Sequence, residues 1–343
     1  MPTAAAAADL PDLSSCRRAL VIKPSSLGDL VHTLPAVHLL KQRYPDLEFT
    51  WLAHPAFAPL LEGNPDLSGT MLFPRSDFRG AAGLWRFRNW LKELPARLRP
   101  DVAIDFQGLL RSGLIARASQ APIRIGFSDS REGARFFHTH IVPVNAGAHA
   151  IDRSLCLPRG LGAAGPAVFP MPAGEDFPAK ASGLRPIVLH PFSRGKGKSL
   201  TAAQAVALCQ ALAPLPVQVV GRAGVDLSGL PENVENLLNL TTLPQLIRLI
   251  RDSRGVISVD SGPMHIAAAL TPRVLSLHTW SDPRKVGPWH AGTTVWKAGR
   301  LMRTEDLDEE VCGMNSDFPD SAVEAVADWG RRLPADPAAA AVC

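Results

Sequence analysis

Short apolar runs rich in β-branched residues alternate along this chain with longer segments in which apolar residues recur at helical spacing. The short runs are typical of buried strands, and the longer segments are typical of helices that cover a sheet. This alternation predicts α/β layers built around parallel sheets. In the first half of the chain we expect strands at residues 19–23, 47–53, 102–105 and 123–126, with helices that include residues 30–43 and 84–99.

A stretch rich in Gly, Pro and Ala, at residues 160–183, indicates a linker before a second series of the same kind. The second series has expected strands at residues 186–190, 217–220, 255–259 and 273–277, and expected helices at residues 201–212, 243–251 and 264–270. We therefore predict two doubly wound domains that face a central cleft, with ligands at the carboxyl ends of the strands. We expect a disordered leader at 1–16, a first domain at 17–165, the linker at 166–184, a second domain at 185–320, and a C-terminal helix and tail at 321–343 that pack back on the first domain.

The composition is that of a soluble globular protein. Its 343 residues suffice for two domains, and hydrophobic and charged contents of 46% and 20% exclude a disordered chain. No window approaches the roughly 18 uninterrupted apolar residues of a transmembrane helix. Residues 1–15 carry acids where a signal peptide carries Lys or Arg, so we expect a cytosolic protein. The five cysteines show no Cys-x-x-Cys spacing, so we expect neither disulfides nor a zinc site.

Positive charge is concentrated in one segment. The net charge is only +4, but residues 75–135 hold twelve Lys/Arg against six Asp/Glu. Within this segment, residues 84–92 interleave Trp and Phe with cations, which suits an anionic membrane or an anionic lipid-linked substrate. The alternative, which we favour, is an ordinary amphipathic helix whose Trp and Phe side chains face the core. We do not expect a nucleic-acid partner, because no nucleic-acid motif accompanies the charge.

The most informative stretch is the expected strand-to-helix turn at residues 259–270. Ser261 and Pro263 are residue types that start helices, at the N-cap and in the first turn. A helix that opens after a parallel strand directs N–H groups and its positive dipole end toward the carboxyl edge of the sheet, where they can bind phosphate. His265, on the first turn, could donate to a phosphate oxygen or a ribose. An ordinary capped turn explains residues 260–263 equally well.

Two turns in the first domain also carry candidate chemistry. Residues 23–29 lack the fingerprint G-x-G-x-x-G but place Asp29 at a helix start, either as a helix cap or as a general base. Asp105 ends an expected strand, and Gln107 and Arg111 follow it. Their side chains could hydrogen-bond sugar hydroxyls or a carboxylate.

The second domain opens with a loop at residues 192–199 that is rich in Gly and cations. It lacks the Walker A spacing, which disfavours a phosphate-transferring P-loop, but it fits diphosphate binding. A solvated basic turn is the alternative. Asp306 and Asp308 match a metal-binding Asp-x-Asp only superficially, so we expect a solvated segment there and no metal site.

Four stretches, taken together in chain order, make this sequence resemble the bacterial ADP-heptose:lipopolysaccharide heptosyltransferases. These are inverting glycosyltransferases of family 9 with the two-Rossmann GT-B fold. The resemblance extends from about Arg18 to about Val295. Its motifs are at residues 24–36, 105–112, 124–127 with 130–132, and 259–270, and residues 281–285 and the pair His149 and Arg153 support them.

The resemblance implies a role for each matching residue. Asp29 corresponds to the base that deprotonates the acceptor hydroxyl, which then attacks the anomeric carbon of an ADP-sugar with inversion and without a metal ion. No cofactor is implied, because the ADP-sugar is a substrate. The first domain would bind an acidic Kdo-lipid A acceptor through Ser26, Gly28, Gln107, Arg111, Arg131, His149 and Arg153. The second would bind the nucleotide-sugar donor through Ser193, Arg194, Lys198, Asp260, Ser261, Gly262, Pro263, Met264 and His265.

The resemblance also implies a location, at the cytoplasmic face of the inner membrane, where the segment 84–92 would contact lipid.

Three departures from the motifs of the family leave alternatives open. Residues 198–201 replace a Lys-Arg/His-Trp-Pro motif, so the functional lysine is either Lys196 or Lys198. Arg222 stands where an acidic residue is common, and residues 278–281 replace a Gly-Pro-Thr turn. The alternatives are a family member with another donor or acceptor, a nucleotide-sugar 2-epimerase, and a scaffold without catalysis. The loop with Asp29 favours sugar transfer over epimerisation.

Overall fold

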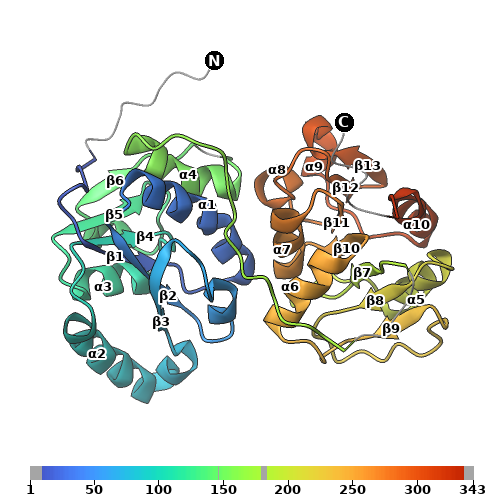
Figure 1. Cartoon of the computed structure of the whole chain (residues 1–343), viewed down its shortest axis with the longest axis horizontal. Coiled ribbons are helices and arrows are strands. Elements are labelled where there is room, and N and C mark those ends of the chain that lie inside the picture. The colour runs from blue at the N-terminus through green and yellow to red at the C-terminus, as the bar shows by residue number, and fades with distance from the viewer. Residues whose placement is uncertain (1–9, 146, 179–183, 336–343) are drawn as a thin grey trace. The chain divides into compact units, whose positions relative to one another are not determined.

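The computed structural model describes residues 10–145, 147–178 and 184–335, and the chain divides into two compact units after Pro172 (Figure 1). This division lies within the segment 166–184 that the sequence predicts as a linker. Leu13 and Cys16 are buried, so the prediction of a disordered leader is wrong for the residues around them. Residues 1–9 of the predicted leader lie outside the described residues.

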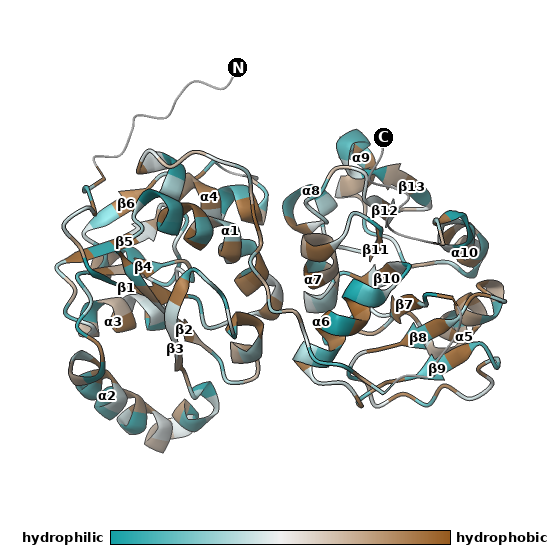
Figure 2. Ribbon diagram, in the orientation of Figure 1, coloured by the Kyte–Doolittle hydropathy of each residue, from teal (hydrophilic) through white to brown (hydrophobic). Residues whose placement is uncertain are grey.

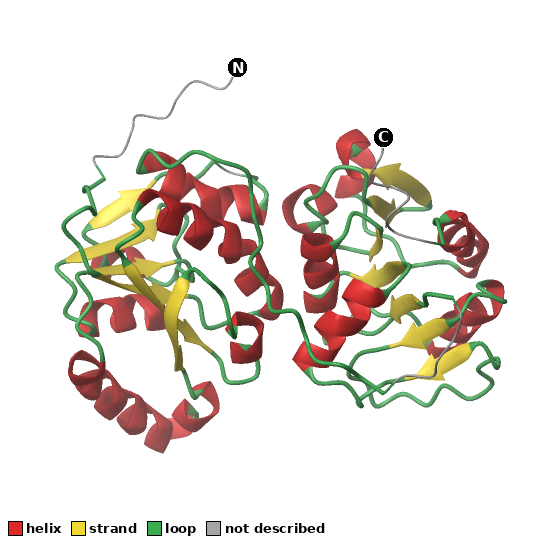
Figure 3. Ribbon diagram, viewed as in Figure 1, coloured by secondary structure: helices red, strands yellow, loops and turns green. Residues whose placement is uncertain are grey.

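The first unit is built on a six-stranded parallel sheet with the order β3-β2-β1-β4-β5-β6 (Figure 3). The chain begins in the middle of the sheet and winds outward to each edge in turn, which is the doubly wound arrangement. Leu20 of β1 lies opposite Thr50 of β2 and Ala103 of β4. The strands are β1 (Arg18–Ile22), β2 (Glu48–Ala53), β3 (Leu67–Leu72), β4 (Val102–Asp105), β5 (Ile123–Phe127) and β6 (His140–Val142).

Helices cover both faces of this sheet (Figure 1). Leu20 and Ile22 of β1 pack into one core with residues of α2 and α3. Because side chains alternate along a strand, Ala19 and Val21 point to the other face, where α1 and α4 contact each other. The helices are α1 (Leu27–Arg43), α2 (Gly80–Arg97), α3 (Leu110–Ala118) and α4 (Ala150–Gly160), with short 3-10 turns η1 (Ala58–Leu61), η2 (Arg75–Phe78) and η3 (Ala134–Phe137).

The second unit repeats this topology around a seven-stranded sheet with the order β13-β12-β11-β10-β7-β8-β9. All pairs are parallel except β12 with β13. The central strands are apolar, as their brown colour in Figure 2 shows, and they are buried on both faces. The strands are β7 (Ile187–His190), β8 (Val217–Val219), β9 (Val234–Asn236), β10 (Gly255–Val259), β11 (Val274–His278), β12 (Thr294–Lys297) and β13 (Arg300–Arg303).

Six helices complete the second unit among its described residues. Thr201 and Thr242 cap the first two of them, and each is followed three residues later by Gln, which closes a capping box. The helices are α5 (Ala202–Ala211), α6 (Leu243–Asp252), α7 (Gly262–Leu270), α8 (Pro283–Val286), α9 (Glu309–Gly313) and α10 (Val323–Arg332), with 3-10 turns η4 (Thr304–Asp306) and η5 (Asp320–Ala322).

Five of the strands are absent from the sequence-based prediction: β3, β6, β9, β12 and β13. Four of them have only three or four residues, too few for an alternating pattern to stand out. β12 and β13 form a hairpin whose two turn residues, Ala298 and Gly299, both have positive φ. Pairing with a neighbour, rather than local pattern, makes these segments strands.

The C-terminal helix corrects one prediction. We expected it to pack against the first domain, but α10 packs against α5 of the second unit. Val326 and Ala327 are buried in the core of that unit, and a Cβ at Gly330 would lie 2.8 Å from the side chain of Leu212. A small residue at position 330 therefore lets the two helices approach each other closely.

Helix α2, which contains the basic aromatic segment, has two different apolar faces. Phe87 and Trp90 are buried and pack with Phe73 and Phe78, as our favoured interpretation requires. Trp85 does not follow them, because 64% of its surface is exposed. The core interpretation is thus correct for two of the three large aromatic residues and wrong for Trp85.

Candidate active site

Each sheet has one point where the strand order reverses, and the candidate residues lie at these points. In the first unit the reversal is between β1 and β4, and in the second it is between β7 and β10. The loops that leave two such strands diverge to opposite faces of the sheet, so a crevice forms outside their carboxyl ends. The loops after β1 and β4 carry Asp29 and Gln107, and those after β7 and β10 carry Lys198 and Asp260.

Asp29 lies in the first turn of α1 with a fixed carboxylate. The backbone N–H and the hydroxyl of Ser26, the N-cap residue, both donate to Asp29 Oδ2, at 2.9 and 2.7 Å. The other oxygen, Oδ1, lies 3.8 Å from Lys23 Nζ, and 43% of the side chain is exposed. Oδ2 therefore takes part in the helix cap, and the side chain is still partly exposed to solvent, so Asp29 can both cap the helix and face a ligand.

Lys23 is a member of the site that sequence reasoning did not assign. It directly follows β1, is almost fully buried, and donates to the carbonyl oxygen of Phe106 at 3.3 Å. Burial lowers the pKa of its ammonium group, and the carboxylate of Asp29 opposes that shift. A lysine at the end of an apolar strand was the signal that could have identified it.

The side chains around Asp29 form a polar pocket of about 340 Å³. It combines three cationic side chains with two carboxylates, and it therefore suits a ligand that carries both negative charge and hydroxyl groups. The residues that line it are Lys23, Asp29, His32, Thr33, Gln107, Gly108, Asp129, Arg131, Ala150, Arg153 and Ser154.

The two predicted arginines of this pocket are held differently. Arg153 makes a bidentate ion pair with Asp129, at 2.6 and 2.8 Å, and its guanidinium lies 4.4 Å from the centre of the Phe127 ring. Its position is thereby fixed. Arg131 is exposed, and its backbone N–H donates to the carbonyl oxygen of Gly108 at 2.8 Å, which ties the two loops together.

Four predicted acceptor residues do not line the pocket. Ser26 binds the carboxylate of Asp29, and Gly28 is buried in the first turn of α1. His149 caps α4, and its ring lies edge-on to His32, with 5.8 Å between the ring centroids. Arg111 points to α2, where its guanidinium lies 5.6 Å from the centre of the Phe87 ring.

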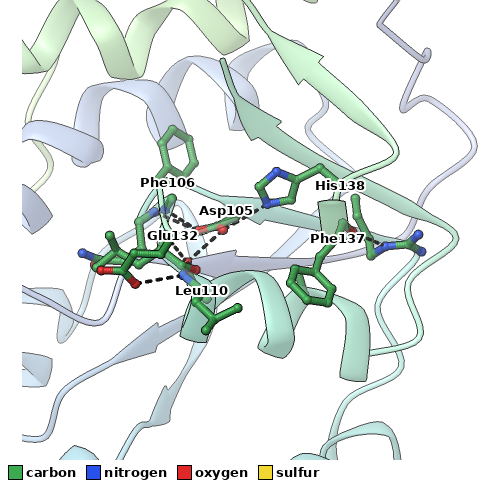
Figure 4. A network of polar contacts seen from close by, with 12 residues as sticks. Asp105, Phe106, Leu110, Glu132, Phe137 and His138 are labelled. Carbon is green, nitrogen blue, oxygen red and sulfur yellow. Dashed lines mark hydrogen bonds and ion pairs between the residues drawn. The ribbon is translucent and has the colours of Figure 1, made fainter. Parts of the chain in front are cut away.

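Asp105 is a structural carboxylate (Figure 4). One oxygen accepts from the N–H groups of Gln107 and Gly108, both at 2.9 Å, and the other accepts from Ser112 Oγ at 2.9 Å and His138 Nε2 at 3.0 Å. The side chain is fully buried. It therefore fixes the loop that brings Gln107 to the pocket, and its hydrogen bonds occupy it fully.

In the second unit, the loop after β7 brings Lys198 to Asp260, which directly follows the neighbouring strand β10. Lys198 Nζ donates to Asp260 Oδ2 at 2.5 Å, whereas Arg194 and Lys196 are exposed. Of the two candidate lysines, Lys198 is thus the one that contacts Asp260. Ser193 accepts from the N–H of Gly195 at 3.1 Å, and its own N–H donates to Ser199 Oγ at 2.9 Å, so it shapes the loop.

Helix α7 begins two residues earlier than its apolar pattern indicates, at Gly262, with Ser261 as the N-cap. His265 Nε2 lies 3.9 Å from Asp260 Oδ1, which places the imidazole, the carboxylate and the helix start together. The side chain of Met264 is fully buried, so this residue can offer a ligand only its backbone. Ser261 Oγ lies 3.1 Å from Nδ1 of the buried His190.

Burial and charge set the protonation of this cluster. Burial lowers the pKa of His278 and of His190 to about 4 in each case, so both imidazoles are neutral at pH 7. Burial alone would raise the pKa of Asp260, but His278, His265 and Lys198 together hold it below its usual range. His278 is neutral at pH 7, and the ammonium of Lys198, 2.5 Å from Asp260 Oδ2, is a charge that stabilises the carboxylate there.

Three further features concern only the part of the chain that the structure describes. No group of three or more His, Cys, Asp or Glu side chains is arranged to hold a metal ion. Asp308 instead caps α9 and pairs with Arg300. Cys16, Cys156, Cys209 and Cys312 are free thiols. No helix is both long and apolar enough to cross a membrane.

Comparison of the sequence with known proteins indicates one family. A sequence model of glycosyltransferase family 9 (heptosyltransferase) matches residues 91–171 and 221–311, half of the chain. The chain is 28% identical to lipopolysaccharide heptosyltransferase 1 of Pseudomonas aeruginosa, over 84% of this chain and 87% of that protein. It is also 28% identical to lipopolysaccharide heptosyltransferase 3 of Escherichia coli K12, over 80% of this chain and 86% of that protein.

The fold has relatives among solved structures. E. coli heptosyltransferase WaaC with ADP-2-deoxy-2-fluoro heptose superposes with a TM-score of 0.70, at 21% identity, over 91% of this chain and 99% of that one. At this identity the superposition supports the fold, and the two doubly wound units are those of the predicted GT-B class.

Proposed function

Because this chain belongs to glycosyltransferase family 9, the heptosyltransferases, we propose that it transfers heptose or a related sugar from an ADP-sugar to the inner core of lipopolysaccharide. The observation that carries this proposal is the Asp29 carboxylate at the edge of a cationic pocket, with one oxygen held by Ser26 and 43% of the side chain exposed. The acceptor class follows from the cations that line the pocket, because the inner core and its lipid anchor are acidic.

In the proposed reaction, Asp29 is the general base. A hydroxyl group of the acceptor gives its proton to the carboxylate, and the hydroxyl oxygen attacks the anomeric carbon of the donor sugar. A new glycosidic C–O bond forms while the C–O bond to the diphosphate breaks, and ADP leaves. Attack from the face opposite the leaving group inverts the configuration at the anomeric carbon. The nitrogen of Lys23 lies 3.8 Å from Asp29 Oδ1, and a protonated ammonium group at this distance stabilises the carboxylate.

The donor site is assigned to the second unit. Lys198 and the start of α7 supply positive charge where the diphosphate would develop negative charge, so we infer that no divalent cation is needed. Asp260, 2.5 Å from Lys198, offers its carboxylate to a sugar hydroxyl, and His265 lies beside it. No cofactor enters this mechanism, because the nucleotide sugar is consumed as a substrate.

A donor-by-acceptor assay tests this function. Purified protein is incubated with Kdo-lipid A and with ADP-heptose, ADP-glucose, UDP-glucose or GDP-mannose, with and without EDTA; products are identified by mass, and their stereochemistry by NMR. We expect transfer from ADP-heptose, with unchanged rate in EDTA and with an inverted anomeric centre in the product. Transfer only from a UDP- or GDP-sugar would refute the proposal that an ADP-sugar is the donor. Epimerised donor without a transfer product would favour the epimerase alternative.

We also propose that α2 contacts the anionic surface of the inner membrane from the cytoplasmic side. Leu84 and Trp85 are 70% and 64% exposed and line an apolar groove of about 510 Å³ together with Leu91 and Leu114. Arg88 lines the same groove, and Lys92 follows on the same helix. Exposed aromatic and aliphatic side chains next to cations fit an interface of acyl chains and anionic headgroups.

Vesicle sedimentation checks this contact. The double variant Leu84→Ser, Trp85→Ser should partition about tenfold less than wild type into vesicles that contain phosphatidylglycerol, because it removes the apolar part of the contact. Leu240→Ser is the matched control, since Leu240 is an exposed leucine of the second unit. Equal partitioning of the double variant and wild type would refute the role of α2, as would equal binding of wild type to purely zwitterionic vesicles.

A further inference from the structure

The loop between β11 and α8 presents an exposed tryptophan next to Lys198. The indole of Trp280 is 52% exposed, and the ammonium nitrogen of Lys198 lies 4.5 Å from its ring centroid. A lysine over the face of an indole at this distance is attracted by the electron-rich ring. Lys198 is thereby held from two directions, by the carboxylate of Asp260 and by the ring of Trp280.

The backbone on both sides of Trp280 is anchored by a buried lysine. Lys297, at the end of β12, is 0% exposed, and its Nζ donates to the carbonyl oxygens of Thr279 at 2.6 Å and Ser281 at 3.1 Å. Burial lowers the pKa of this ammonium group, because a charged group loses favourable contacts with water when it is buried. The two carbonyl groups that accept from it flank Trp280 directly, so the clamp fixes the tryptophan backbone.

The tryptophan loop is also joined to the lysine loop. Thr279 Oγ1 donates to the carbonyl oxygen of Gly197 at 2.8 Å, one residue before Lys198. On the other side, Ser281 Oγ lies 3.0 Å from Nδ1 of the buried His278. The distance between the backbones of Trp280 and Lys198 is therefore set by hydrogen bonds that do not involve either side chain.

We propose that Trp280 is a positioning residue, which acts on the donor diphosphate through Lys198. The proposal rests on the proposed donor site. A lysine side chain has a flexible four-carbon stem, and fixing it when a ligand binds costs conformational entropy. The indole restricts the ammonium group to the place beside the Asp260 carboxylate before the ligand arrives. The residues that replace the Gly-Pro-Thr turn in this chain thus supply a contact to the functional lysine.

A double-mutant cycle tests the proposal. Trp280→Leu and Trp280→Phe are made in the wild-type chain and in a Lys198→Met background, and Kd for ADP and for inorganic pyrophosphate is measured by calorimetry. We expect Trp280→Leu to weaken both ligands about fivefold when Lys198 is present and less than twofold when it is absent. Trp280→Phe should fall between wild type and Trp280→Leu, because a phenyl ring attracts a cation less strongly than an indole does.

Other outcomes of the cycle have distinct meanings. Equal weakening in both backgrounds would mean that Trp280 contacts the ligand itself, and unchanged affinity would mean that it has no role; either result overturns the proposal. If wild type binds pyrophosphate but not ADP, the proposed donor fails, and the pyrophosphate cycle still decides the role of Trp280. If it binds neither, both proposals fail. Leu240→Ala, an exposed site in the same unit, is the control, and the melting temperature reports folding.

Discussion

Asp29→Asn is expected to lower the rate of sugar transfer by about a thousandfold while leaving the affinity for the ADP-sugar within about twofold. The amide cannot accept the proton of the acceptor hydroxyl, but its carbonyl oxygen can still accept the hydrogen bonds from Ser26. The proposed donor residues belong to the other unit, so donor binding does not depend on this carboxylate. The measurements are the initial rate with Kdo-lipid A and calorimetry with ADP-heptose.

Asp46→Asn is the matched control for this substitution, because Asp46 is an exposed carboxylate of the same unit that pairs with exposed Arg17. Its transfer rate should equal that of wild type. An Asp29→Asn variant that retains more than a tenth of the wild-type rate would remove Asp29 from the mechanism. A variant that loses rate and donor affinity together would instead indicate a folding defect.

Asp105→Ala is expected to lower the free energy of unfolding by about 3–5 kcal/mol. The substitution removes the carboxylate that accepts from His138 Nε2, Ser112 Oγ and the N–H groups of Gln107 and Gly108 in a fully buried site. The Gln107 N–H and Ser112 Oγ each keep a second acceptor, the carbonyl oxygens of Ile22 and Leu109, so the largest loss falls on His138 and Gly108. A Cβ at Gly126 would lie 2.1 Å from the His138 ring, so the imidazole is tightly enclosed and has little room to find another partner. Urea denaturation followed by circular dichroism measures the effect.

Asp77→Ala serves as the control for the stability experiment, since Asp77 is an exposed carboxylate on η2 of the same unit. It should change the free energy of unfolding by less than about 0.5 kcal/mol. A similarly small change for Asp105→Ala would show that the network does not hold the loop. We expect the Asp105 variant also to lose transfer activity, because Gln107 and Gly108 line the pocket around Asp29.

The sequence identified the two sheets and the loops that carry the candidate site through local patterns. Strands β4 and β10 were predicted with their observed bounds, and the turns after them follow from the capping residues and from Gly and Pro. Asp29, Lys198 and Asp260 are found where the sequence placed them, at the carboxyl edges of the strands. Patterns of this kind extend over only a few residues, so they can be recognised without knowledge of the fold.

Those local patterns could not predict contacts between residues that are far apart in the chain. Asp105 was predicted only to end a strand, and its partner His138 lies 33 positions later in the chain. Lys23 was predicted to end the first strand and was given no role, yet its ammonium group donates to the carbonyl oxygen of Phe106. Arg111 was expected at the acceptor site, and its guanidinium instead lies over the ring of Phe87.

By itself, the sequence determined the α/β class, the doubly wound pattern, the family and the loops that carry the chemistry, because hydrophobic periodicity, capping residues and motifs are encoded over a few residues. Only the tertiary structure decided which charges are paired, which of Lys196 and Lys198 meets Asp260, and what holds Trp280 beside that lysine. These properties depend on burial and on hydrogen bonds between strands that are adjacent in a sheet but far apart in the chain.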